Sequence, residues 1–145
     1  MNLQLSRSIP IPVITLLLWV CPAGASAQAP INDPVAALRS AKVIYVKSHS
    51  VVVGVSVIEE KLQERPEFSQ MGLVITRDIV AADVILEVHH DILTKYVYSA
   101  VYARTSLVLA TGKLSSLGGT VAGKVAKRFL KQVMQARATA PRNSS

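Results

Sequence analysis

Three or four short apolar runs, separated by polar turns of only a few residues, constrain the fold of this chain most strongly. Neighbouring parallel strands need a crossover of a dozen or more residues between them, whereas antiparallel strands need only a hairpin. The spacing therefore predicts that these runs form an antiparallel meander. The runs are residues 72–76, 83–89, 96–103 and 107–114.

A first strand and a first helix precede these runs. Residues 42–48 are β-branched and roughly alternating, which predicts a strand with Ile44 facing the core. Ser56 is followed three residues later by Glu59, the spacing of a capping box, so a helix is predicted to begin there. Pro66 is expected to stop or kink that helix.

An amphipathic helix closes the predicted domain. Apolar residues recur every three to four positions from Val121 to Met134, and the helix is expected to end near Arg137. The order β-α-β-β-β-β-α implies an α+β two-layer sandwich, in which both helices cover one face of a mostly antiparallel sheet of four to five strands. The other face is expected to be open to solvent or to a partner.

The N-terminus indicates export. Arg7 is followed by an apolar run over residues 9–20 and by small residues that end in Ala25-Ser26-Ala27, the pattern of a secretory signal peptide. The run is shorter than the ~20 residues that span a bilayer, so a cleaved signal is predicted rather than a retained anchor. We expect cleavage after Ala27 and a secreted or periplasmic protein.

This interpretation divides the chain into four parts. Residues 1–27 are the signal peptide, 28–41 an N-terminal tether with one helical turn near its end, 42–137 a single α/β domain, and 138–145 a disordered tail. The only cysteine, Cys21, lies in the signal and lacks the small residue before it that lipid attachment requires. The mature domain therefore has no thiol or disulfide chemistry.

The charge of the chain is uneven. The formal net charge is +7, and from Lys113 onward there are basic residues but no acidic one. Such an end favours lipid head groups, cell-wall polymers or nucleic acid, and outside the cytoplasm the first two are the more available. Cations near a helix C-terminus also complement the helix dipole without any partner. The predicted anionic-surface site is Lys124, Lys127, Arg128 and Lys131.

Two segments of the sequence resemble known functional motifs, a phosphate-binding loop and a histidine metal site. Residues 118–124 contain Gly-x-x-x-x-Gly-Lys, but a phosphate-binding loop needs a hydroxyl after the lysine and Val125 stands there, so no nucleotide site is expected. His89-His90-Asp91 suggests a metal cluster that His49 could join from a neighbouring loop. Because adjacent strand residues point to opposite faces, His89 and His90 cannot easily share an ion, and no metal site is predicted.

No catalytic set is found either. The chain lacks the Gly-x-Ser-x-Gly motif of hydrolases, and the glutamates of the first helix are expected on a solvated surface with basic partners. No cofactor is predicted, and the protein is not expected to be an enzyme. The glutamates concerned are Glu59, Glu60, Glu64 and Glu67.

Three tyrosines share the even-numbered face of one predicted strand. If Val97 and Val101 face the helices, these tyrosines line the open face of the sheet with Tyr45 of the first strand, an aromatic surface of the kind enriched at interfaces. The opposite parity would bury them, and they could also simply cover the sheet. The predicted partner-binding residues are Tyr45, Tyr96, Tyr98 and Tyr102.

The second half of the chain resembles secreted envelope α/β domains. Ala82-Asp83 opens a strand, the turn 103–106 joins the last two strands, and a basic helix closes the domain. The class includes transport-auxiliary lipoproteins, curli-secretion lipoproteins and penicillin-binding-protein activators. The turn here lacks the usual Asp and Gly, and the chain lacks the lipid-bearing cysteine. The resemblance implies this fold and action through protein contacts.

Taken with the signal peptide, these patterns predict an exported, non-enzymatic binding or accessory domain. Its partner is expected to be an envelope protein or another copy of the chain. The alternative is a domain that binds an anionic polymer or a membrane surface through its basic C-terminal helix.

Overall fold

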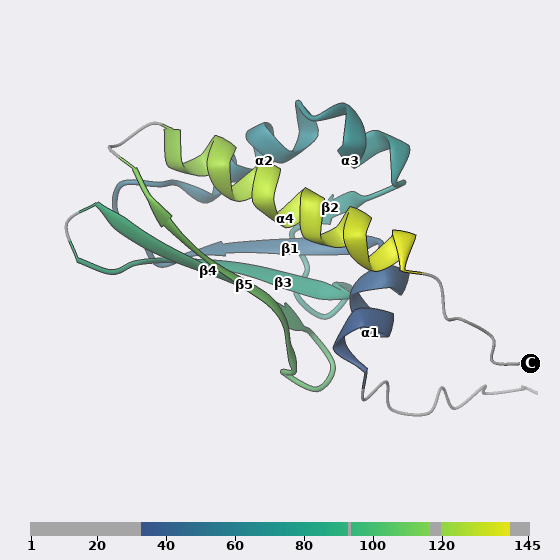
Figure 1. Cartoon of the computed structure of the whole chain (residues 1–145). Coiled ribbons are helices and arrows are strands. Elements are labelled where there is room, and N and C mark those ends of the chain that lie inside the picture. Colours follow the sequence, from purple (N-terminus) through teal and green to yellow (C-terminus); the bar gives the residue numbers. More distant parts are fainter. Residues whose placement is uncertain (1–32, 93, 117–119, 140–145) are drawn as a thin grey trace, which may run out of the picture.

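The computed structural model describes residues 33–92, 94–116 and 120–139, and it folds them into a five-stranded sheet with helices packed on one face (Figure 1). No helix in these ranges has the length and apolar character needed to cross a membrane. In chain order the elements are α1 (Pro34–Ser40), β1 (Val43–Ser48), α2 (Val55–Gln63), α3 (Pro66–Gln70), β2 (Val74–Thr76), β3 (Val84–His90), β4 (Lys95–Tyr102), β5 (Val108–Ser115) and α4 (Val121–Ala138).

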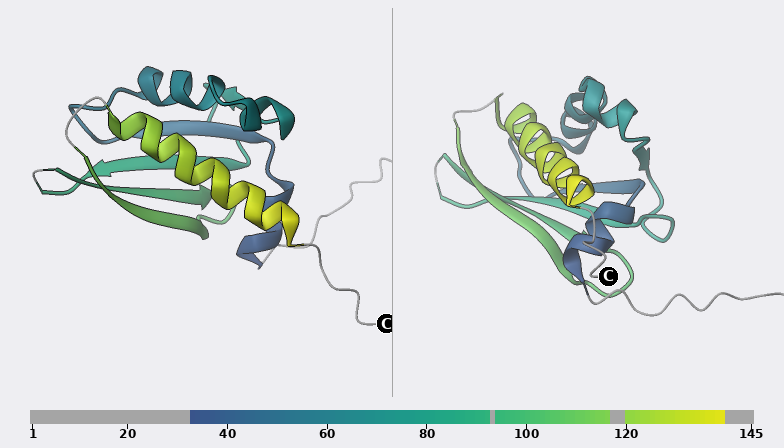
Figure 2. Two further views of the ribbon diagram at one scale, coloured as in Figure 1. Left: turned by 45° about the horizontal axis from the view of Figure 1, so that its top comes forward. Right: turned by 45° about the vertical axis from the view of Figure 1, so that its right-hand side comes forward.

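The predicted α+β two-layer architecture is confirmed. Both views in Figure 2 show α2 and α4 on the same side of the sheet. Residues 34–40, assigned from the sequence to the tether, form α1, which packs against α4 and β5 and buries Ala37 and Leu38. The signal peptide, the start of the tether, Gly118 and Gly119, and most of the predicted tail lie outside the described residues.

The sheet is mixed, with strand order β2-β1-β3-β4-β5. β1 pairs in parallel with both β2 and β3, and only β3, β4 and β5 form an antiparallel meander. The expectation that residues 72–76 begin the meander was therefore wrong. α2 and α3 supply the long crossover that parallel pairing of β1 with β2 requires, and residues 77–83 carry the chain from β2 past β1 to β3.

Asp83 fixes the start of both central strands. Its carboxylate Oδ2 accepts hydrogen bonds from the backbone N–H groups of Lys42 and Val43, each at 2.9 Å. Its own N–H donates to the carbonyl of Val43 at 2.9 Å, and its carbonyl accepts from Ala103 at 3.0 Å. One residue thus ties the beginnings of β1 and β3 to the end of β4, at the Ala-Asp position singled out from the sequence.

One hydrophobic core fills the space between the sheet and the helices. Ile44 faces it as predicted, and Val125 is fully buried there, on the apolar side of α4. α2 begins one residue before Ser56, with Gly54 as its N-cap and without a side-chain capping bond. The predicted capping box is therefore wrong, because Ser56 already lies inside the first turn.

Candidate functional site

The tyrosines of β4 do not form the predicted partner surface. Tyr96, Tyr98 and Tyr102 are only 3%, 1% and 8% exposed, because the even-numbered face of β4 is the one that α4 covers. Val97 and Val101 consequently lie on the open face, so the assumed parity of the strand was wrong. Only Tyr45, half-buried on β1, occupies the face expected for it.

The contacts of Tyr98 explain why the tyrosines of β4 face the core. Its ring lies over Gly112, the residue opposite it on β5, where an added Cβ would come within 2.3 Å of the ring. Its hydroxyl donates to Oε1 of Gln132 on α4 at 2.9 Å, so the polar end of the side chain is satisfied while the ring is buried. Burial raises the pKa of Tyr98, and the nearby Arg128 guanidinium partly opposes this shift.

The face of the sheet opposite α2 and α4, called the open face here, has an apolar end. Tyr45, Ile85 and Val101 lie side by side on β1, β3 and β4. The β2–β3 connection adds Ile79 and Val80, whose side chains are 47% and 88% exposed. These two residues, with Ile85, line a hollow that Ala82, Ala103 and Arg104 complete.

The other end of the open face is polar. His49 follows β1, and its N–H donates to the carbonyl of Val88 at 2.8 Å, which extends the parallel pairing and sets His49 beside His89. The two imidazole rings stack with centroids 4.3 Å apart and planes 8° from parallel. Glu87, two residues before His89, places Oε2 3.6 Å from His89 Nε2 and Oε1 3.4 Å from Lys47 Nζ.

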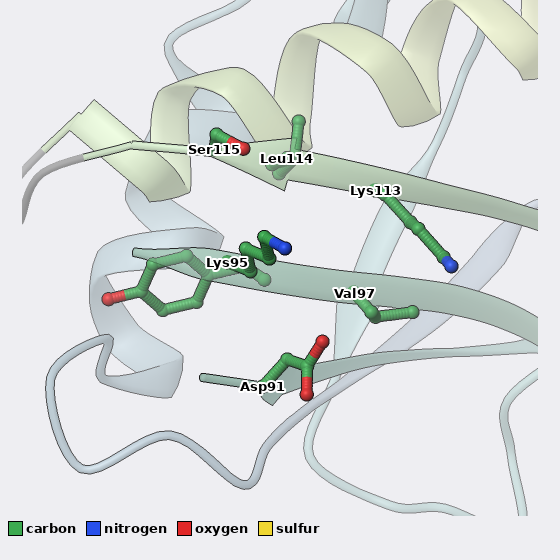
Figure 3. Close-up of a pocket in the computed structure, with 7 residues that line it drawn as sticks. Asp91, Lys95, Val97, Lys113, Leu114 and Ser115 are labelled. Atoms are coloured by element: carbon green, nitrogen blue, oxygen red, sulfur yellow. The ribbon is translucent and has the colours of Figure 1, made fainter. Parts of the chain in front are cut away.

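A charged pocket adjoins this polar end. Asp91, Lys95 and Lys113 line it together with Val97, the neighbour of His89 across the β3–β4 pair. Figure 3 shows the Lys113 side chain extending from β5 toward β4, Val97 on β4, and the Asp91 carboxylate below Val97. The open face is thus apolar where β1 and β3 begin and charged where they end.

The basic side of α4 is divided between two roles. Lys124 Nζ donates to the carbonyl of Ser115 at 3.4 Å, and Arg128 donates to the carbonyl of Lys113. These two of the four predicted anion-binding residues therefore bind the outer edge of β5. Lys127 and Lys131 are exposed on the same helix.

The comparisons with known proteins do not identify the chain. No protein-family model matches it, and no curated protein is similar in sequence. Among solved structures, it is similar to the PelC dodecamer from Paraburkholderia phytofirmans, with 13% identity over 68% of this chain and 88% of that one and a TM-score of 0.35. A PelC variant from the same organism gives 12% identity over 68% and 90%, with a TM-score of 0.39.

A third solved structure is an uncharacterised lipoprotein B from Nitrosomonas europaea, with 16% identity over 67% of this chain and 81% of that one and a TM-score of 0.32. TM-scores this low support no conclusion about function. The resemblance to particular envelope lipoproteins stays an expectation from the sequence.

The glutamates of the first helix do not all lie on a solvated surface. Glu60 and Glu64 are exposed, and the hydrogen bond from Lys61 lowers the pKa of Glu64. Glu59 is instead buried, with Oε2 2.6 Å from the Arg77 guanidinium and Oε1 without a hydrogen-bond partner. The expectation was wrong for Glu59 because Arg77, directly after β2, reaches this residue of α2, a pairing between distant residues that the local sequence does not encode.

From the sequence, His49 was considered as a neighbour of His89 and His90, but the grouping of His49 and His89 with Glu87 was not predicted. The alternation rule correctly separated His89 from His90, whose ring lies against Tyr96 with centroids 4.7 Å apart. The alternation rule compares residues of one strand, so it says nothing about a residue beside His89 on the adjacent strand. The signal that could have found the cluster is the spacing Lys47-x-His49 beside Glu87-x-His89, but it becomes visible only once β1 and β3 are known to be parallel.

Proposed function

We propose that this protein is an exported, non-enzymatic binding domain whose open face receives a protein partner with an acidic surface and an apolar centre. The observation that supports it is the exposed apolar hollow around Ile79, Val80 and Ile85, on a face that none of the described helices covers. Burial of such a hollow would supply affinity, while the charged residues around it would select the partner.

The charge of the molecule favours an acidic partner over a second copy. The net charge is +7, and Arg104 borders the hollow while Lys95 and Lys113 line the pocket at the far end of the same face. Two copies joined through this face would bring like charges together, which disfavours association, whereas an acidic protein would be attracted. Export is supported by the N-terminal sequence pattern, with cleavage after Ala27.

The test replaces one exposed residue of the hollow. Val80→Glu is expected to abolish binding of the partner captured from the host envelope fraction, because it places a negative charge in the apolar contact. Val57→Glu is the matched control, since Val57 is 41% exposed on α2, on the covered side of the sheet. The captured protein must be acidic, must bind the control variant, and must bind less at high salt.

Two outcomes would contradict the proposal. If the same proteins bind both variants, the hollow is not the contact. If ultracentrifugation shows a dimer that Val80→Glu dissociates, the occupant is a second copy instead. Export is checked separately by the intact mass of the native protein, which should begin at Gln28; a full-length protein in the cytoplasm would overturn that part.

A second candidate function is binding to an anionic lipid or cell-wall polymer through α4. It is favoured by the exposure of all four cations on one helix: Lys124, Lys127, Arg128 and Lys131. Because Lys127 and Lys131 are the pair that β5 does not engage in the described structure, Lys127→Glu/Lys131→Glu should abolish sedimentation with phosphatidylglycerol vesicles. Binding that is unaffected by salt or by this change would exclude the function.

A further inference from the structure

His49, Glu87 and His89 gather at the polar end of the open face. Each offers one ligand atom, and these atoms all lie within 4.8 Å of one another. The parallel pairing of β1 with β3 holds the three backbones in register, and His49 is tied to Val88 by its own N–H. Glu87 and His89 thus project from β3, and His49, the residue directly after β1, is held beside them by a backbone hydrogen bond.

We propose that His49, Glu87 and His89 bind a divalent transition-metal ion, with Zn²⁺ as the representative. Two imidazoles and one carboxylate suit zinc and its neighbours, whereas calcium and magnesium prefer oxygen ligands alone. Three protein ligands leave a fourth tetrahedral position, as in open zinc sites. Here that position faces solvent, because His49 is exposed and the His89 side chain is 46% exposed.

Only a small movement of the three side chains is needed to bring their ligand atoms to the separations found around a zinc ion. Zinc bonds of about 2.0–2.2 Å in a tetrahedron place ligand atoms roughly 3.4 Å apart. The Glu87–His89 pair, at 3.6 Å, is already near this separation. The remaining closure requires the stacked rings of His49 and His89 to tilt toward a common point, which exposed side chains can do by rotation about their χ angles.

Lys47 supplies an outer-shell contact to the site. Its ammonium lies 3.4 Å from Oε1 of Glu87, which leaves Oε2 directed at His89. Groups that orient a ligand in this way commonly matter for metal affinity almost as much as the ligands do. The carboxylate is therefore held with one oxygen occupied and the other toward the imidazoles.

Calorimetric titration of the untagged protein with Zn²⁺ tests the proposal. Wild type is expected to bind one ion, and His49→Ala, His89→Ala and Glu87→Gln should each weaken binding at least about tenfold, since even outer-shell changes cost 10–100-fold. His90→Ala is the matched control, because His90 adjoins His89 in sequence but lies against Tyr96. Thermal melts establish that each variant is folded.

A second measurement keeps the test independent of affinity. The chain has 3 histidines, so their imidazole C–H signals are easily resolved by NMR. Zn²⁺ should shift those of His49 and His89 and leave His90 unchanged. The proposal is overturned if His90→Ala loses as much affinity as His89→Ala, if Glu87→Gln binds as wild type does, or if His90 is the histidine that shifts. Neither measurement requires the protein partner.

Discussion

At the scale of single residues, Tyr98 determines how the sheet meets α4. It is 1% exposed, lies over Gly112, and reaches Gln132 with its hydroxyl. The sequence pattern was interpreted as placing this tyrosine on the open face of the sheet, where its replacement would not disturb the core. In the structure, Tyr98→Ala removes a buried aromatic ring, and such changes cost about 3–5 kcal/mol.

Two glycines give opposite expectations for the same substitution. Gly112→Ala would bring a methyl group within 2.3 Å of the Tyr98 ring and is expected to destabilise the fold by about 1–3 kcal/mol. Gly123→Ala, inside α4, meets no heavy atom within 4 Å and should stabilise it by about 0.8–1.0 kcal/mol. Urea denaturation measures both, and a Gly112→Ala variant as stable as the wild type would contradict the packing described for Tyr98.

Tyr98 also makes stability depend on pH in the alkaline range. Because burial raises its pKa in the folded state, the neutral hydroxyl is favoured there, and this contribution is complete below the unfolded pKa of about 10. It is lost as the pH rises through the higher folded pKa. The wild type should therefore lose more stability above about pH 10 than Tyr98→Phe does.

The measurement compares urea midpoints at neutral and alkaline pH. At neutral pH, Tyr98→Phe should cost about 0.5–1.5 kcal/mol through the lost hydrogen bond to Gln132. Tyr45→Phe, on the open face, controls for general alkaline effects. Equal alkaline losses in the wild type and Tyr98→Phe would show that Tyr98 does not produce the dependence.

At the scale of elements, side chains at regular intervals on α4 donate hydrogen bonds to the outer edge of β5. Lys124, Arg128 and Gln132 follow one another at intervals of four residues, a rise of about 6 Å along the helix. They donate to the carbonyls of Ser115, Lys113 and Thr111, which follow at intervals of two residues, about 6.8 Å along the strand. The near match lets one helix side occupy successive edge carbonyls, the groups through which edge strands recruit other strands.

Removal of these donors should expose the edge. Lys124→Ala/Arg128→Ala is expected to self-associate at high concentration, because the freed carbonyls of β5 can pair with a strand of another molecule. Lys127→Ala/Lys131→Ala lowers the net charge by the same amount but keeps the hydrogen bonds from Lys124, Arg128 and Gln132 to β5, so it should behave as the wild type does. Size-exclusion chromatography with light scattering compares them; equal association would mean that charge, not the edge, matters.

Much at this scale was predictable from the sequence. Five strands, the first long helix and the closing helix lie close to their predicted positions, because apolar periodicity and prolines determine them locally. The partner of β2 was not predictable, since parallel pairing depends on where α2 and α3 return the chain. The face of β4 was not predictable either, because alternation defines two faces without saying which one the helices cover.

At the scale of the whole molecule, the candidate sites follow from these unpredictable features. The predicted tyrosine surface does not exist because the tyrosines of β4 face α4 and not the open face. The His49, Glu87 and His89 cluster exists because β1 and β3 are parallel. The basic helix was identified correctly from the sequence, but its division into edge-binding and outward cations depends on α4 lying along β5. Composition predicted the charge of the molecule, and topology decided where that charge is displayed.

The contact between α1 and α4 brings the two ends of the described domain together. Arg39 Nε donates to the carbonyl of Ala136 at 2.9 Å, and its guanidinium also reaches the carbonyl of Thr139. A chain with adjacent ends tolerates a new order of its segments. A circular permutant that joins Thr139 to Asp33 through a short linker and opens between β4 and β5 should therefore keep the wild-type circular dichroism spectrum and a cooperative melt.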